Sequence, residues 1–161
     1  MKQLVSLRIS LHQQIIRRMT RLGLCTSSYL VEAFKRWYLW SHFKVETSRA
    51  LSGAKLEEAK TRLNKITKNV AIAGIKKRYP QLDSDRQVLR CTESQVAKIK
   101  AVGIYKLKIT DKDLKRYIEK TIDRKVFLYD LTIAEAHHSI ERLEKWEVKN
   151  YKKSREKSGN R

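Results

Sequence analysis

The chain has 161 residues, of which 37 are Lys or Arg and 17 are Asp or Glu, so its formal net charge is +20. Hydrophobic residues make up 41% of the chain, and there are only five glycines and one proline. This composition excludes a wholly disordered chain and favours helices. The positive charge predicts an anionic partner. Nucleic acid is favoured over a membrane, because the sequence has no lipidation signal and no apolar run of about 20 residues.

Residues 2–9 alternate between apolar and polar side chains, a period that is typical of a β-strand. One face of this strand would hold Val5, Leu7 and Ile9 against a core. The opposite face would hold Lys2, Leu4, Ser6 and Arg8. A lone strand leaves its backbone hydrogen bonds unmade, so the pattern predicts antiparallel pairing with a second copy in a homodimer. An edge strand in a mixed α+β domain is the alternative.

Two helices are predicted after the strand, over residues 10–22 and from about residue 27 to residue 40. Ser10 fits an N-cap of the first helix, and Gly23 fits the left-handed position after its end. Thr26 or Ser27 would cap the second helix.

Residues 2–40 resemble the ribbon-helix-helix DNA-binding proteins, and the best match, over residues 22–34, reads LGLCTSSYLVEAF. In that family a two-stranded ribbon enters the major groove, and the second helix binds a phosphate at its N-terminus. The resemblance implies base contacts to double-stranded DNA from the outward row Lys2, Leu4, Ser6 and Arg8. It also implies phosphate contacts from Cys25, Thr26 and Ser27. The chain lacks the proline or acidic residue that usually starts the family's first helix.

A weak linker at residues 48–53 precedes six apolar residues in heptad spacing, Leu56, Ala59, Leu63, Ile66, Val70 and Ala73. They predict one long helix that ends near residue 78 or 79, before Pro80. Basic residues occupy its other faces, and Lys76, Lys77 and Arg78 are candidate phosphate contacts. Because two of the six seam positions are alanine, packing on the rest of the same chain is favoured over a dimerising coiled coil.

Three further helices are predicted after Thr92, Thr110 and Thr132, and each threonine fits an N-cap. Gly103 would close the first of them. Gln95 with Ile99, the helix start TDKDL at residues 110–114 and above all DLTIAEA at residues 130–136 before IERL at residues 140–143 resemble a small helical module. That module is appended to phage and plasmid recombination or single-strand-annealing proteins. A generic three-helix bundle is an equal alternative. The basic tail, with Lys152, Lys153 and Arg155, would contact phosphates or form a solvated helix end.

No pattern predicts a catalytic residue, a metal site or a cofactor. His137 and His138 are adjacent and would diverge on a helix, while Asp111 and Asp113 fit the acidic first turn of a helix. No histidine or acidic residue follows Cys25 at a spacing that would indicate a catalytic nucleophile. With only two cysteines, a reducing cytoplasm is expected, where the protein would be associated with the nucleoid.

The predicted fold is therefore mainly α, with a dimeric ribbon-helix-helix followed by a long helix and a small helical bundle. Its parts are a DNA-binding and dimerisation domain (1–45), a connecting helix (46–80), a helical module (81–148) and a basic tail (149–161). The predicted function is sequence-specific binding of double-stranded DNA, as a repressor or site-marking factor of a mobile element. The alternative is a non-enzymatic nucleic-acid-binding subunit of a larger recombination, transposition or RNA-guided complex, with single-stranded DNA and RNA left open as partners.

Overall fold

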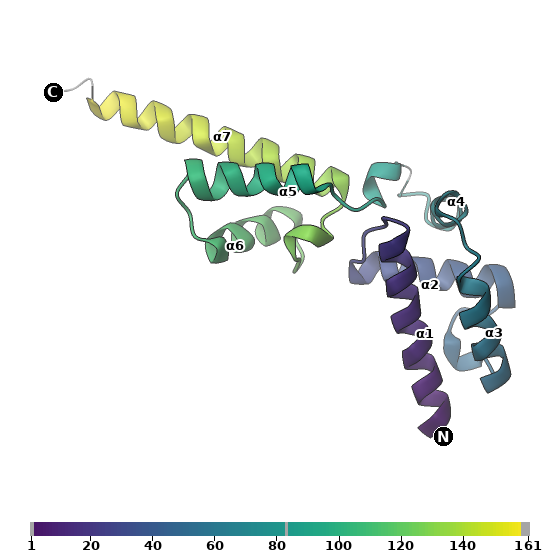
Figure 1. Cartoon of the computed structure of the whole chain (residues 1–161). Helices are drawn as coiled ribbons and strands as arrows, with labels where there is room; N and C mark the ends of the chain where they lie inside the picture. Colours follow the sequence, from purple (N-terminus) through teal and green to yellow (C-terminus); the bar gives the residue numbers. More distant parts are fainter. Residues whose placement is uncertain (1, 83, 159–161) are drawn as a thin grey trace. The chain divides into compact units, whose positions relative to one another are not determined.

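The computed structural model describes residues 2–82 and 84–158, without the side chains of Lys2, Val148 and residues 150–158. The chain forms two compact units, Met1–Leu89 and Arg90–Arg161, each with its own hydrophobic core. Helices make up both units, and the described residues form no strand (Figure 1). The predicted ribbon-helix-helix architecture is therefore wrong, although the expectation of a mainly helical chain is correct.

Helix α1 (Lys2–Arg21) runs unbroken through the residues that were predicted to form a strand and a separate first helix. The residues of α1 that face the core recur every three or four positions, as a helix requires. They are Leu4, Leu7, Leu11, Ile15 and Met19. Val5 and Ile9, which the strand would bury, are 52% and 54% exposed. The alternation over residues 2–9 was too short to distinguish the two periods, and the helical one continues into the following segment. The backbone groups of these residues pair within α1, which removes the hydrogen-bonding reason for strand pairing between two copies.

Helix α2 (Ser28–Phe43) is the predicted second helix. The Ser27 hydroxyl accepts a hydrogen bond from the backbone N–H of Leu30 at 3.4 Å, so Ser27 is the N-cap. Gly23 has a φ of +70° and ends α1, as expected. The helix ends at Lys44, whose φ of +57° turns the chain away from the helix axis.

Two helices, α3 (Gly53–Leu63) and α4 (Lys68–Arg78), replace the single long helix that the heptad spacing predicted. Thr67 caps α4 by accepting a hydrogen bond from the N–H of Val70. Arg18 of α1 holds the connection in place, because its Nε and Nη2 donate to the carbonyl of Ile66 at 3.1 and 2.5 Å. Val70, a predicted seam residue, is 51% exposed, and α4 packs instead through Ala71, Ile72 and Ile75.

The N-terminal unit is built by pairing α1 with α3 and α2 with α4, while α1 also contacts α2. Figure 1 shows α1 and α3 side by side. At the centre, the fully buried Tyr38 donates its hydroxyl proton to the carbonyl of Ala59 at 2.5 Å. Burial raises the pKa of Tyr38 above its ordinary value, so this phenol remains a neutral donor. Two 3₁₀ turns, Ser48–Ala50 and Asp85–Gln87, complete the unit.

In the C-terminal unit, α5 (Glu93–Lys100) and α6 (Asp111–Ile122) both pack on α7 (Ile133–Ser158). A π-helical segment, Ala101–Lys106, continues α5, so Gly103 does not close that helix as predicted. Gly103 is needed for close packing instead, because a Cβ there would lie 2.6 Å from Cδ1 of Leu114. The 3₁₀ turn Leu128–Asp130 precedes α7.

The three helix starts that the threonines predicted are present in this unit. Thr92 and Thr110 accept hydrogen bonds from the N–H groups of Gln95 and Asp113, both at 3.2 Å. Thr132 accepts one from the N–H of Glu135 at 3.1 Å. Local capping chemistry therefore located these starts correctly.

We predict that Gly74→Ala destabilises the N-terminal unit. A Cβ on Gly74 would overlap the indole of Trp37, whereas a Cβ on Gly53 would lie 3.6 Å from Cδ2 of Leu4, an ordinary contact. Overpacking costs about 1–3 kcal/mol and exceeds the 0.5–1 kcal/mol that alanine gains over glycine in a helix, by rough estimate. Urea unfolding followed by tryptophan fluorescence measures this change. Gly53→Ala is the matched control and should be neutral or stabilising. Equal effects of the two variants would contradict the close contact.

Candidate nucleic-acid interface

Three of the residues that were predicted to contact bases, Leu4, Ser6 and Arg8, do not share a surface. Leu4 packs against the core, Ser6 is exposed, and Arg8 is half-buried and donates from Nη2 to the carbonyl of Arg49 at 3.3 Å. The side chain of Lys2 lies outside the described residues. Residues two apart on a helix point in nearly opposite directions, so these three side chains form no row on α1 that could face a groove.

The three predicted phosphate contacts lie at the turn before α2. Cys25 is buried, and its N–H donates to the carbonyl of Val88 at 2.9 Å. Ser27 caps α2 with its side chain, and its carbonyl accepts from the N–H of Val31 at 2.9 Å. Thr26 is half-buried between them. This segment therefore serves the N-terminus of α2 and the neighbouring backbone, and Cys25 is not exposed to a ligand.

A hollow of about 420 Å³ lies between α2 and α4 and is called here the α2–α4 hollow. It is lined by Trp37, Trp40, Ser41, Lys44, Gly74, Lys77 and Arg78. Two of these, Lys77 and Arg78, were predicted from the sequence as phosphate contacts. The third predicted residue, Lys76, forms an ion pair with Asp85 at 3.0 Å instead.

Helix packing creates this hollow. Gly74 lets the backbone of α4 approach the ring of Trp37, which is only 8% exposed. Three residues further along α2, Trp40 lies at the surface with 44% of its area exposed. The guanidinium of Arg78 lies over the Trp40 ring, 5.5 Å from its centre.

No carboxylate lines the α2–α4 hollow. Arg78 donates from Nη2 to both carboxylate oxygens of Glu46, at 2.5 and 2.6 Å, so its charge is partly neutralised. Lys44 and Lys77 are exposed, and neither forms an ion pair with another residue that the structure describes. Two uncompensated ammonium groups therefore border an aromatic surface.

A second hollow, of about 350 Å³, lies in the C-terminal unit and is called the α6–α7 hollow. It is lined by Tyr117 of α6 and by Arg142, Lys145, Trp146 and Lys149 of α7. The ring centres of Tyr117 and Trp146 are 5.1 Å apart, and the rings are tilted by 34°. As in the first hollow, aromatic rings are combined with three basic residues and no acid.

Most residues of both hollows were not predicted, although their spacing held a signal. Trp37 and Trp40 are spaced by three, as are Gly74 and Lys77, and the α7 residues of the second hollow recur at spacings of three, four and seven, which place each set on one helix face. Which two helix faces meet had no signal in the sequence, because it depends on tertiary packing. The predicted tail contacts Lys152, Lys153 and Arg155 lie in α7, but their side chains are outside the described residues.

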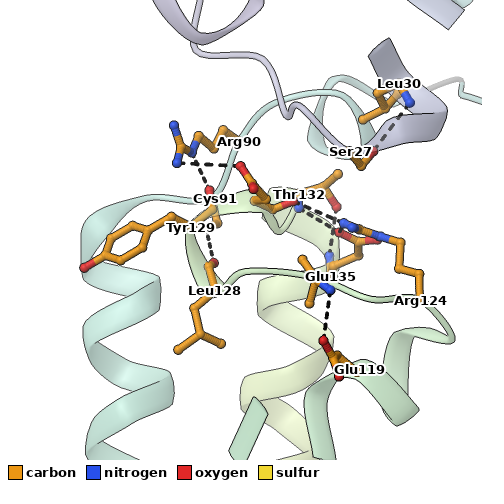
Figure 2. Close-up of polar contacts among 12 residues, drawn as sticks. Ser27, Leu30, Arg90, Cys91, Glu119, Arg124, Leu128, Tyr129, Thr132 and Glu135 are labelled. Atoms are coloured by element: carbon orange, nitrogen blue, oxygen red, sulfur yellow. Dashed lines mark hydrogen bonds and ion pairs between the residues drawn. The ribbon is translucent and has the colours of Figure 1, made fainter. Parts of the chain in front are cut away.

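The start of α7, which carries the second hollow, is held by an ion-paired network (Figure 2). Arg124 donates from Nε and Nη2 to the two carboxylate oxygens of Glu135, at 2.9 and 2.6 Å. Glu135 also accepts from the N–H of Thr132 at 2.8 Å. Burial alone would raise the pKa of Glu135, but these hydrogen bonds outweigh it, and the pKa lies below its ordinary value.

Two of the residues that were considered for catalysis or metal binding have side-chain partners. Asp113 accepts a hydrogen bond from the Thr110 hydroxyl at 2.8 Å, as expected for the first turn of α6. His137 lies 3.4 Å from Glu141 on the exposed face of α7. Across the described part of the chain, no three side chains of metal-ligating type come together. The absence of a catalytic, metal or cofactor function remains a prediction.

Comparisons with protein-family models, curated proteins and solved structures found no significant match for this chain. None of the helices that the structure describes is long and apolar enough to span a membrane.

We predict that Glu135→Gln destabilises the C-terminal unit at neutral pH by about 1–3 kcal/mol, because it removes a partly buried charged partner of Arg124. The pKa of Glu135 in the folded state lies below its ordinary value, so the stabilisation is complete above that ordinary pKa and is lost as the pH falls through the lowered pKa. The difference between wild type and variant should therefore shrink in acid. Native-state hydrogen exchange of α7 amides measures it. Glu141→Gln, on the exposed face, should change stability by less than about 0.5 kcal/mol. A difference between wild type and Glu135→Gln that did not depend on pH would contradict the role of the carboxylate.

Proposed function

We propose that this chain is a non-enzymatic nucleic-acid-binding protein that holds the phosphate backbone at the α2–α4 hollow. The observation that supports this most strongly is the pair of uncompensated cations, Lys44 and Lys77, beside Arg78 in a hollow with no acidic lining. Ammonium groups that bind phosphates release the counterions condensed on nucleic acid, which supplies affinity without reading sequence.

The charge of the whole N-terminal unit supports the same proposal. Residues 1–89 contain 18 Lys and Arg and six Asp and Glu, so this unit carries the larger share of the net charge of +20. Such an excess steers a polyanion toward the surface and raises the rate of association.

Among the functions predicted from the sequence, a nucleic-acid-binding subunit of a larger recombination, transposition or RNA-guided complex agrees best with this site. A repressor that contacts bases in the major groove through a two-stranded ribbon has less support, because residues 2–9, which were to form the ribbon, belong to helix α1. Phosphate contacts alone fix position and affinity and carry no sequence information. A mobile-element setting rests on the resemblance of residues 130–143, and a homodimer remains a separate prediction.

We predict that the double variant Lys44→Gln/Lys77→Gln weakens binding to random-sequence duplex DNA by about 10- to 30-fold near 0.15 M salt. Two lost phosphate contacts should also reduce the slope of log K against log salt by about 2. Fluorescence anisotropy across a salt series measures both quantities. The control, Lys55→Gln/Lys65→Gln, removes the same charge from exposed positions of α3 and the turn after it. An equal loss in both double variants would indicate diffuse attraction and would overturn the assignment of the site.

A further inference from the structure

We infer that the α6–α7 hollow is a second binding site, which takes an unpaired nucleotide by stacking its base on Trp146 and Tyr117. This site lies on other residues than the α2–α4 hollow, and its chemistry goes beyond attraction to phosphate. It would give the protein a preference for single-stranded nucleic acid.

Three exposed aromatic rings of the chain are covered by a cation, whereas the two rings of this hollow, like the exposed Tyr29 and Tyr105, are not covered by any cation that the structure describes. The rings of Trp40, Phe127 and Tyr129 each have a cation above them, from Arg78, Lys115 and Lys100 respectively, within 6 Å of the ring centre. No described cation lies in this way over Tyr117 or Trp146, which contact only each other among the aromatic residues described. Both are half-buried, so each ring is anchored while part of its surface remains accessible.

The cations beside these rings are arranged along one face of α7. Arg142, Lys145 and Lys149 are exposed and take part in none of the ion pairs among the described residues. They span eight residues, or about 10 Å of helix, which is long enough to follow a phosphate backbone.

Two acidic residues of α7, Glu144 and Glu147, form ion pairs away from the hollow. Glu144 pairs with Lys98 at 2.9 Å, and Glu147 pairs with Lys106 at 3.2 Å, both toward α5 and the segment that continues it. These two carboxylates neutralise lysines of α5 and of the segment that continues it, and they form no ion pair with the three cations of the hollow. The hollow therefore combines accessible rings with a local positive charge.

An unpaired nucleotide matches this combination better than a duplex does. Every base has a flat π-face that stacks on tryptophan or tyrosine, and its phosphates are held by nearby cations. In a duplex those faces are already stacked on neighbouring base pairs, so only the phosphates would be available to the hollow. An acidic peptide would use the cations alone and would leave the rings without a partner.

The experiment compares two fluorescein-labelled strands of equal charge, a thymidine 12-mer and an abasic 12-mer, by anisotropy with the full chain. Stacking of one base predicts that the thymidine strand binds at least about fivefold more tightly. Trp146→Leu should reduce this ratio to below about twofold and should change binding of the abasic strand little. Phe127→Leu, which removes an exposed ring of the same unit outside the hollow, should leave the ratio intact.

Trp146 also packs against the core, so its substitution affects folding as well as the hollow. A second pair of variants therefore tests the hollow without changing this ring. Lys145→Gln/Lys149→Gln should weaken binding of the thymidine strand more than Lys112→Gln/Lys125→Gln, which removes the same charge from exposed positions elsewhere in the unit. A 2-aminopurine base placed in the strand should be quenched by the wild type and by Phe127→Leu, and not by Trp146→Leu.

The outcomes separate this inference from the proposed function. Equal affinity of the wild type for the thymidine and abasic strands would overturn base stacking, as would a ratio that Trp146→Leu leaves unchanged. If the ratio were one while Lys44→Gln/Lys77→Gln still weakened all strands, phosphate binding at the first hollow would stand alone. If the ratio survived and that double variant had no effect, the α6–α7 hollow would be the binding site and the proposal for the first hollow would fail.

Discussion

The approach of α2 to α4 at Gly74 is the constraint on which the first candidate site depends. With no side chain at that position, the indole of Trp37 packs directly on the backbone of α4. This contact places the exposed end of α2, with Trp40 and Lys44, beside the last turn of α4, with Lys77 and Arg78. The same residue that permits core packing therefore determines how closely the cations and the aromatic ring of the surface come together.

The distribution of acidic residues explains why cations are available at all. Most acids of the chain are engaged by nearby bases within their own unit, as Glu135 is by Arg124 and Glu144 is by Lys98. The more exposed pairs, such as Glu144 with Lys98, contribute little stability, about 0–1 kcal/mol each. Their main consequence here is spatial, since pairing on other faces leaves each hollow without a carboxylate. With 20 more basic than acidic residues, uncompensated charge is unavoidable, and packing determines where it collects.

Sequence reasoning located the features that depend on a few neighbouring residues. The caps at Thr92 and Thr110 and the left-handed residue at Gly23 were predicted correctly, and Ser27 is one of the two caps that the sequence offered for α2, because each needs one side chain or one backbone conformation. The prediction of one long middle helix was wrong because the chain breaks at residues 64–67, where Thr67 caps α4 locally and Arg18 of α1 donates to the carbonyl of Ile66. The heptad spacing outweighed the local cap at Thr67, and the contact with Arg18 depends on tertiary packing. The hollows could be predicted only in part, since three of the seven lining residues of the first come from α4 and one of the five of the second comes from α6, and tertiary packing brings them to the other helix.

The resemblance of residues 22–34 to a ribbon-helix-helix turn illustrates the same limit. A glycine after a helix, a small polar N-cap and an apolar face on the next helix recur wherever two helices are joined by a short turn. Those features are present here, at Gly23, Ser27 and the buried row of α2 that includes Leu30 and Phe34. They describe a helix–turn–helix connection and do not specify what precedes it. The helical conformation of residues 2–9 is favoured by Leu4 and Leu7, which continue the apolar row of α1 and pack against the core beside α3. In a strand, Leu4 would have faced outward. A local motif therefore carried correct information about the turn and none about the ribbon.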